Sequence, residues 1–501
     1  MPFPDGNRVA RWMLGLAVAT AILSALLMAV RAYSAISLAE PLQAATRGCE
    51  YESSYVFWKY VSGLPIFVDP TRIPFAGTYY NWLYYVFYGE IIRFFLGALS
   101  LSEAWIPTIS KLATLAGAMV GTIVTTIAFA RLIAKGDVWL TALGAALAGY
   151  LFLGPLMGFW GISNAPDVWA LVFDVAALAL FLELYGRRPR AAILAFAALA
   201  YLAWSFKQTF VFGVGTVGLF LLWRRDWRGV ALLIAVMSSL WAATLLAGGA
   251  VYQKSILAFG GTQVKLQTYD FFRNLGIFIS KEMPLIAGLA LLPALWPNRR
   301  RILREDDVLT FALIGTIFSF VLTLPASAKQ GAGDNYYFVP SLYLSLVLLA
   351  ALARLKRENA VPRRGLACVA GGWLISMLGI VSVLTGLNGV LSVRKYHDDL
   401  MAINRALGEL PQPSFIAPPY LELPWMRAKA QHFVYHCSYL WDRAAGVPME
   451  RGGIGGLINE GYFASLAFPA ENETFDGAAL DRYRALPETR QGFIIYIRRD
   501  P

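Results

Sequence analysis

Apolar residues in this chain gather into runs of roughly 20, separated by short polar segments that carry most of the arginine and lysine. Runs of that length predict helices that cross a lipid bilayer, because a helix of about 20 residues spans its hydrocarbon core. We therefore expect an all-α polytopic membrane protein. The predicted crossings, about eleven in number, cover residues 12–30, 107–133, 138–160, 168–185, 191–205, 209–223, 229–252, 275–296, 308–325, 338–353 and 365–387.

The basic clusters between these runs predict an orientation. Cytoplasmic segments of membrane proteins are enriched in lysine and arginine. If every cluster faces the cytoplasm, an even number of crossings separates neighbouring clusters, which places the N-terminus inside and the C-terminus outside. The clusters are Arg8 and Arg11; Arg131 and Lys135; Arg187, Arg188 and Arg190; Arg224, Arg225 and Arg228; Arg299, Arg300, Arg301 and Arg304; and Arg354, Lys356, Arg357, Arg363 and Arg364.

One further run, residues 82–99, is apolar enough to cross but contains Glu90 and Arg93. A crossing here would move every later basic cluster to the outside. We therefore predict an amphipathic helix that lies in the outer interface, with its aromatic side chains at headgroup level.

The first outer loop, about residues 34–106, is unusually long for a polytopic protein, and it is rich in acidic and aromatic residues. Residues 1–391 are predicted to form the membrane domain. Residues 392–501 have ordinary charge and no apolar run long enough to cross, which predicts a small soluble α+β domain on the outer side. The segment 492–497 is rich in β-branched and aromatic residues, as is typical of a strand.

Composition supports a membrane protein and excludes several other classes. Hydrophobic residues make up 57% of the chain and charged residues 15%, compared with about 25% charged residues in soluble domains. The net charge of +11 comes from clusters between apolar runs, so it indicates membrane topology and not nucleic-acid binding. Three cysteines exclude a disulfide scaffold, although Cys49 and Cys437 both fall outside the cytoplasm and a bridge between them stays open.

The polar residues predicted to face outward are the candidates for chemistry. A carboxylate can act as general base on an acceptor hydroxyl or amine. Nearby cations can hold a phosphate and stabilise the charge that develops on it as a leaving group. The candidate bases are Glu50 and Glu52, and the candidate binding residues are Asp69, Arg72, Tyr80, Lys111, Asp167, Lys207, Gln208, Lys329, Asn335 and Tyr336.

Each of these residues also has an ordinary structural interpretation. The glutamates could be solvated loop acids, and Asp69 before Pro70 could simply form a turn. Lys207 could extend to the outer interface without binding anything. His432 and His436 have helical metal-ligand spacing, but no convincing further ligand follows, so no metal site is predicted.

These short patterns resemble the glycosyltransferase C superfold, in particular the protein O-mannosyltransferases and aminoarabinose transferases of glycosyltransferase family 39-like membrane proteins. In that group one helix precedes a large outer loop with an acidic motif, a Gly-x-Pro-Tyr-x-Asp-like turn and an aromatic interfacial helix. The matching segments here are Glu50-Tyr51-Glu52, Gly63-Leu64-Pro65-Ile66-Phe67-Val68-Asp69, Lys111, Asn164-Ala165-Pro166-Asp167, Lys207-Gln208 and Lys329 to Tyr336.

The chain departs from the family pattern in two places. The acidic motif is Glu-x-Glu instead of Asp-Glu, and Ile66 stands where Tyr is usual, with the Asp one residue late. The resemblance covers roughly residues 1–390 and implies inverting transfer of a sugar from a polyprenyl-phosphate donor to a lipid, glycan or protein acceptor. It also implies a bacterial inner membrane location and a first-loop carboxylate as base, with Glu50 and Glu52 both open. Some members of the superfold use a divalent cation and others do not.

Two other classes of function also fit parts of the sequence. A transporter or flippase for a lipid-linked or anionic substrate would have a similar number of helices, but it usually shows two related halves, and none is visible here. A scaffold subunit on a degenerate enzyme fold would be favoured by loss of the first-loop acids, and both glutamates are present.

Overall fold

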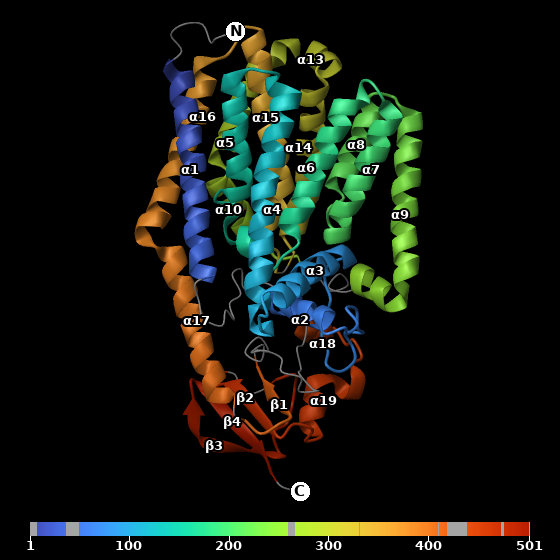
Figure 1. Ribbon diagram of the computed structural model, residues 1–501, viewed down its shortest axis with the longest axis vertical. Helices are drawn as coiled ribbons and strands as arrows, with labels where there is room; N and C mark the ends of the chain where they lie inside the picture. Colours follow the sequence, from blue (N-terminus) through green and yellow to red (C-terminus); the bar gives the residue numbers. More distant parts are fainter. Residues whose placement is uncertain are drawn as a thin grey trace.

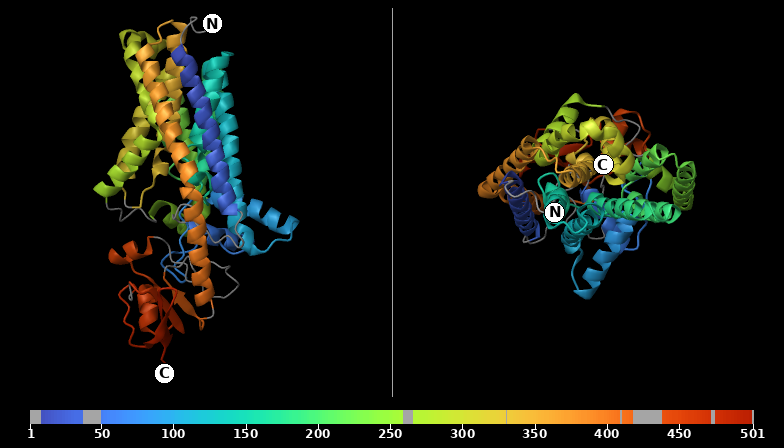
Figure 2. Two further views of the ribbon diagram at one scale, coloured as in Figure 1. Left: turned by 90° about the vertical axis from the view of Figure 1, so that its left-hand side faces the viewer. Right: turned by 90° about the horizontal axis from the view of Figure 1, so that it is seen from above.

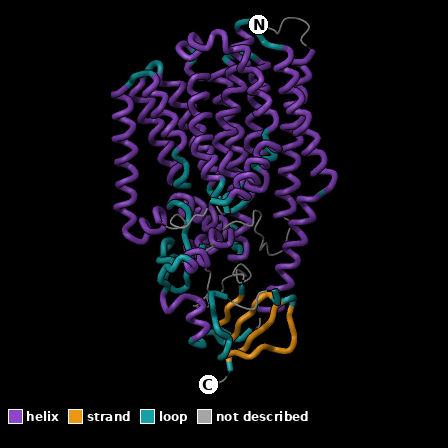
Figure 3. The backbone as a smooth tube through the Cα atoms, turned by 180° about the vertical axis from the view of Figure 1, so that it is seen from behind, coloured by secondary structure: helices purple, strands orange, loops and turns teal. Residues whose placement is uncertain are grey.

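The computed structural model describes residues 8–36, 50–258, 266–329, 331–408, 410–417, 438–471 and 475–499. Long helices run side by side from the end that carries the N-terminus (Figure 1). A small domain with a β-sheet lies at the opposite end, together with the C-terminus. Figure 3 shows the strands confined to that end, while the bundle above is helical.

The bundle helices are α1 (Arg8–Ile36), α4 (Ile106–Phe129), α5 (Val138–Leu153), α6 (Asp167–Tyr185), α7 (Pro189–Phe206), α8 (Phe212–Trp223), α9 (Trp227–Gln253), α10 (Thr268–Lys281), α11 (Met283–Gly288), α12 (Leu292–Leu295), α13 (Arg299–Glu305), α14 (Asp307–Ser327), α15 (Phe338–Arg357) and α16 (Arg363–Gly386). The other helices are α2 (Glu50–Val61), α3 (Trp82–Ala98), α17 (Asn388–Leu407), α18 (Tyr439–Ala444) and α19 (Gly453–Asn459). Short 3-10 or π-helical turns are η1 (Glu103–Trp105), η2 (Ala130–Ala134), η3 (Gly158–Ile162), η4 (Lys254–Ala258), η5 (Leu289–Leu291), η6 (Trp296–Asn298), η7 (Asp334–Tyr337) and η9 (Glu450–Gly452). The strands are β1 (Ser414–Ile416), β2 (Ser465–Pro469), β3 (Tyr483–Arg490) and β4 (Phe493–Arg498).

The prediction of a polytopic helical membrane protein is confirmed. Among the described residues, 8 helices are long and apolar enough to cross a membrane, and the bent pair that begins with α10 would make up to 9. The helices α5 and α8 are apolar but shorter than a typical crossing. With these two, every apolar run predicted to cross corresponds to a helix or to the bent pair.

The predicted crossing at residues 275–296 differs most from expectation, because it is broken. The axis bends by 73° between α10 and the helices that follow. Glu282 lies at the break, with φ −113° and ψ 28°, and Pro284 follows two residues later. A proline here lacks the amide hydrogen that a continuous helix would use to bond the carbonyl oxygen of Ser280, and its ring clashes with that carbonyl group.

The helix α3 lies across the end of the bundle and projects to one side, as Figures 1 and 2 show together. Asn81 caps its first turn by accepting a hydrogen bond from the amide of Trp82 at 2.9 Å. Glu90 and Arg93 pair with each other on its exposed surface at 3.0 Å. The crosswise placement agrees with the predicted interfacial helix.

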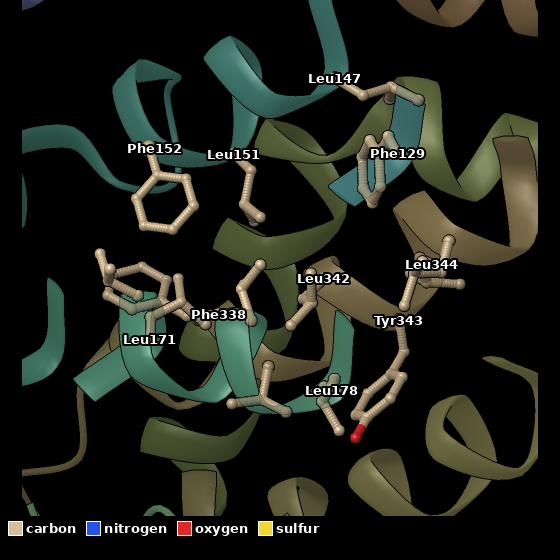
Figure 4. Packing of buried hydrophobic residues seen from close by; sticks show 14 of the residues in the cluster. Phe129, Leu147, Leu151, Phe152, Leu171, Leu178, Phe338, Leu342, Tyr343 and Leu344 are labelled. Carbon is tan, nitrogen blue, oxygen red and sulfur yellow. The ribbon is translucent and has the colours of Figure 1, made fainter. Parts of the chain in front are cut away.

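The core of the bundle surrounds α15, whose residues are almost all buried. Its side chains Phe338, Leu342 and Tyr343 pack against residues of α4, α5 and α6 in the close view of Figure 4. The helix α9, by contrast, lies at the edge and buries few residues. In a membrane such exposed apolar surface faces lipid.

The sheet has the order β1-β2-β4-β3. The strand β1 pairs with β2 in parallel, and the other neighbours are antiparallel. The strand β4 coincides with the segment predicted at residues 492–497. The predicted domain boundary after residue 391 falls inside α17, which runs from the bundle toward the sheet (Figure 1), and that division stays a prediction.

Candidate functional site

Four polar segments meet at the end of the bundle that faces the sheet domain. They are the first loop with α2, the turn before α6, the turn between α7 and α8, and the segment from residue 329 to η7. Each lies where a helix begins or ends, so its polar groups stand at the end of the apolar core. Hydrogen bonds between these segments, described below, make this end the candidate site.

Asp167 and Lys207 form the central ion pair of the site. Lys207 Nζ lies 2.6 Å from Asp167 Oδ1, and the two side chains are 13% and 2% exposed. Asp167 is in the first turn of α6, where the helix dipole favours a negative charge. Lys207 follows the last residue of α7 in an extended conformation, which ends that helix and turns the side chain toward Asp167.

Asn335 completes this group from η7. Its Nδ2 donates to Asp167 Oδ1 at 3.0 Å. The aromatic rings of Tyr80 and Tyr336 lie 5.9 and 6.0 Å from Lys207 Nζ, within the range of cation–π attraction. Gln208 donates through Nε2 to the carbonyl oxygen of Tyr79 at 2.6 Å. The structure thus brings together six residues that the sequence singled out: Asp167, Lys207, Gln208, Asn335, Tyr336 and Tyr80.

Three acceptor atoms of this group are buried and have no hydrogen-bond partner within the described part of the chain. They are Asp167 Oδ2, Gln208 Oε1 and Asn335 Oδ1. A buried acceptor without a donor costs about 1–3 kcal/mol. Such atoms have lone pairs to offer to a ligand that brings its own donors, such as a hydroxylated molecule.

The glutamates Glu50 and Glu52 lie in the first turn of α2, each only 3% exposed. This burial excludes the interpretation of solvated loop acids. Lys111, in α4, is 1% exposed and lies close enough to Glu50 to interact electrostatically. A buried charge needs such a neighbour, so the two positions predicted separately belong to one group.

Asn164 connects the glutamate group with the Asp167 group. Its Nδ2 donates to Ser54 Oγ in α2 at 2.9 Å, and its Oδ1 accepts from Ser110 Oγ in α4 at 2.7 Å. Ser110 precedes Lys111, and Asn164 lies three residues before Asp167. The turn before α6 therefore fixes α2, α4 and the ion pair relative to one another.

The other three predicted residues form no hydrogen bond or ion pair with this group within the described ranges. Asp69 forms an Asx-type turn with Thr71 and an ion pair with Lys254 at 2.8 Å. Although burial raises the pKa of Asp69, hydrogen bonds from Lys254 and Thr71 lower it to about 2. Arg72 is exposed, with no side-chain partner among the described residues. Lys329 is half-buried, burial lowers its pKa, and its backbone forms a bridge with Leu266.

Sequence reasoning missed the residues that extend the site along η7. Asp334 accepts from Lys281 Nζ and from Trp160 Nε1, both at 2.7 Å. Arg31, near the C-terminal end of α1, is 9% exposed and lies 4.8 Å from the ring of Phe159. Charges inside or at the end of apolar helices are usually functional, and this signal could have identified Lys281 and Arg31.

No group of three or more His, Cys, Asp or Glu side chains with metal-binding geometry occurs within the described ranges. His432, His436, Cys49 and Cys437 lie outside the described residues. The disulfide between the two cysteines therefore stays an open prediction.

No protein-family model and no curated protein matches the chain. Among solved structures, the chain is similar to the crystal structure of ArnT from Cupriavidus metallidurans bound to undecaprenyl phosphate. The TM-score is 0.55 at 14% sequence identity, over 95% of this chain and 97% of that chain. The chain has an ArnT-like fold.

This likeness confirms the fold that the sequence patterns predicted, from the first helix to the C-terminal sheet domain. The match covers nearly the whole chain, so it extends beyond the roughly 390 residues that carried the sequence resemblance. At this identity the likeness concerns the fold alone.

Proposed function

We propose that this protein is a membrane glycosyltransferase that transfers a sugar from a polyprenyl-phosphate donor, with inversion, to a lipid, glycan or protein acceptor. The transfer takes place on the periplasmic face of a bacterial inner membrane. The observation that carries this proposal is the buried Asp167–Lys207–Asn335 group, joined through Asn164 to a buried pair of glutamates at one end of an ArnT-like bundle.

The donor phosphate is the ligand that best suits Lys207. The Nζ of Lys207 offers a point charge between the rings of Tyr80 and Tyr336. Asp167 holds this cation in place and leaves its second oxygen open. As the glycosidic bond to phosphate breaks, the cation stabilises the negative charge on the leaving group. Lys111 and Lys329 are further candidates for contact with the phosphate. For Arg72 and Asp69, no interaction among the described residues supports a role in donor binding.

The sugar suits the open acceptors of the same group. A sugar ring presents several hydroxyl donors, and Asp167 Oδ2, Gln208 Oε1 and Asn335 Oδ1 are buried acceptors that lack them. The same oxygens are of the type that a divalent cation prefers, and such an ion would add positive charge beside the phosphate. Removing divalent ions with a chelator separates these two uses of the oxygens.

A first-loop glutamate is the proposed base. Glu50 or Glu52 would take the proton from the acceptor hydroxyl or amine as it attacks the anomeric carbon from the side opposite the phosphate. Glu50 lies close enough to the buried Lys111 to interact with it electrostatically, and both acids lie in the first turn of α2.

Transfer by purified, bilayer-reconstituted protein tests this function. A panel of labelled polyprenyl-phosphate sugars would be offered to the wild type, Glu50→Gln and Glu52→Gln, with thermal unfolding as a check on folding. One substitution should lower transfer by about 100- to 10,000-fold, the usual contribution of a general base. Glu90→Gln is the matched control, because Glu90 is an exposed first-loop acid on α3 that pairs with Arg93.

Two outcomes would contradict the proposal. If no donor is consumed by the wild type, the bundle is not a transferase for these lipids, and flipping of the same labelled lipid across the bilayer becomes the assay. If both glutamine variants transfer normally, the first loop does not supply the base.

A further inference from the structure

The first-loop segment 69–81, here called the strap, connects the bundle with the C-terminal sheet domain. At its start Asp69 pairs with Lys254, at the end of α9. At its end the Nδ2 of Asn81 donates to the carbonyl oxygen of Trp204 at 3.0 Å, and its Oδ1 accepts from the hydroxyl of Tyr252. The strap is therefore attached to the bundle at both ends.

The middle of the strap belongs to the sheet domain. Phe75 has 0% exposure and lies in the hydrophobic core of that domain, with its ring centroid 5.6 Å from that of Tyr439. Glu450 bonds the strap on both sides of Arg72: its amide donates to the carbonyl oxygen of Thr71 at 2.8 Å, and its carboxylate accepts from the amide of Ile73 at 2.9 Å.

Tyr79 makes the contact that matters most for the site. Its hydroxyl accepts from the amide of Ser438 at 3.0 Å and lies 3.3 Å from Ser438 Oγ, just before α18. Its carbonyl oxygen accepts from Gln208 at 2.6 Å. The next residue, Tyr80, places its ring beside Lys207. Tyr79 thus links the sheet domain directly to Gln208 and, through the neighbouring Tyr80, to Lys207.

The same small helix also reaches the second loop of the site. A Cβ at Gly331 would lie 3.3 Å from the ring of Trp441 in α18. Gly331 has a φ of +76°, a conformation that glycine adopts without strain, and it lies between Lys329 and Asn335. The segment around α18 therefore contacts both the strap and the loop that carries Asn335.

We propose that the C-terminal domain acts as a positioning element for the donor site, with Tyr79 as the positioning residue that fixes Tyr80 and Gln208 around Lys207. This inference rests on the proposed function, since it assigns a role toward the donor. Tyr79 itself does not touch the reacting atoms. It acts through its neighbours, which hold the donor in the ground state and in the transition state alike, so its loss affects binding more than the chemical step.

The closing experiment compares Tyr79→Phe with the wild type in the reconstituted transfer assay. This variant loses the hydroxyl that contacts Ser438 and keeps the carbonyl that Gln208 uses. We expect the KM for the donor to rise about 3- to 10-fold, with kcat within about 2-fold of the wild type. A purely structural role would lower the active fraction, and so kcat, and leave the donor KM unchanged.

Tyr483→Phe is the matched control. The hydroxyl of Tyr483 donates to the carbonyl oxygen of Phe463 within the sheet domain, at 3.1 Å, and among the described residues it forms no hydrogen bond with the strap. The KM of Tyr483→Phe for the donor should equal that of the wild type. An unchanged donor KM in Tyr79→Phe, or a fall in kcat alone, would overturn the inference.

Amide hydrogen exchange of both variants in the full-length protein separates failure of this inference from failure of the proposed function. Even if the wild type transfers none of the sugars tested, Tyr79→Phe should exchange faster at residues 79–81 and 206–208, while Tyr483→Phe should not. Equal exchange at these residues in all three proteins would show that Tyr79 does not hold the strap.

Discussion

Two buried aspartates, Asp167 in the bundle and Asp476 in the sheet domain, collect hydrogen bonds in different ways. Their side chains are 2% and 5% exposed. Both oxygens of Asp476 are used: Oδ1 accepts from Arg443 Nε at 2.8 Å, and Oδ2 accepts from the Tyr439 hydroxyl at 2.6 Å and from the Gly455 amide at 2.9 Å. Asp167 accepts two bonds on Oδ1 and none on Oδ2 among the described residues.

This difference separates a structural carboxylate from one with capacity for a ligand. Asp476 fixes the start of α19 and the turn of Gly452 and Gly453, whose φ values are +75° and +77°. Both oxygens of Asp476 accept hydrogen bonds from protein donors, so neither is left open in the way that Asp167 Oδ2 is. Asp167 keeps a buried oxygen open beside a cation, which is an arrangement that stability alone does not favour.

The largest effect on sugar transfer is expected for Asp167→Asn. The substitution keeps the shape and removes the charge that holds Lys207, so transfer per folded molecule should fall about 100-fold, as when one electrostatic contact to a transition state is lost. The measurement is transfer normalised to the folded fraction from thermal unfolding. Normal transfer by folded Asp167→Asn would contradict the distinction between the two aspartates, since Asp167 would then be a structural residue like Asp476.

The matched change, Asp476→Asn, should act on stability instead. Loss of the charged acceptor for Arg443 and Tyr439 should lower the free energy of unfolding by about 2 kcal/mol. A lower thermal midpoint and faster proteolysis of the C-terminal segment would report this, with kcat per folded molecule within about 2-fold of the wild type. Asp481→Asn, at an exposed position of the same domain, should change neither quantity.

A smaller effect is expected for Asn335→Ala. This change removes one of the two bonds to Asp167 and one open acceptor, while the ion pair with Lys207 remains. Transfer should fall about 5- to 10-fold, which corresponds to roughly one hydrogen bond. Measurement of kcat/KM for the donor checks this, and an effect as large as that of Asp167→Asn would show that Asn335 is as important as the ion pair.

The smallest effect is a change of stability with pH that we expect from Asp69, whose side chain is more exposed than that of Asp167 or Asp476. Its pKa in the folded protein, about 2, lies below the value of about 3.9 in an unfolded chain. The pair with Lys254 therefore contributes stability above about pH 4, and this contribution is lost as the pH falls toward 2. Because the side chains are 27% and 44% exposed, solvent weakens the pair and the effect on the thermal midpoint should be small.

Lys254→Gln checks this assignment of the pH dependence. The variant should lose part of the decrease in thermal midpoint that the wild type shows between pH 5 and pH 3. If the thermal midpoint of Lys254→Gln falls as much as that of the wild type, other carboxylates cause the pH dependence.

The site could be predicted from sequence only in part. The turn residues Asp167, Lys207 and Asn335 stood out because they belong to the polar residues predicted to face outward, where carboxylates and cations can act on a phosphate-linked substrate. Arg72 and Lys329 stood out for the same reason, but the structure gives their side chains no partner among the described residues. Lys281 was missed, although a charge at the end of an apolar helix is a signal of the same kind, and its pairing with Asp334, 53 residues further along the chain, could not be predicted from sequence.

What the sequence by itself determined is the series of apolar helices and the C-terminal segment that lacks them, because bilayer thickness and hydrophobic burial act on residues close together in the chain. The lateral order of the helices is not encoded in any local pattern. Only the tertiary structure decided that Asp167 meets Lys207 and Asn335, which lie 40 and 168 residues away, and that Tyr79 meets Ser438, 359 residues away. These pairings follow from helix packing, which brings turns from distant parts of the chain to the same end of the bundle.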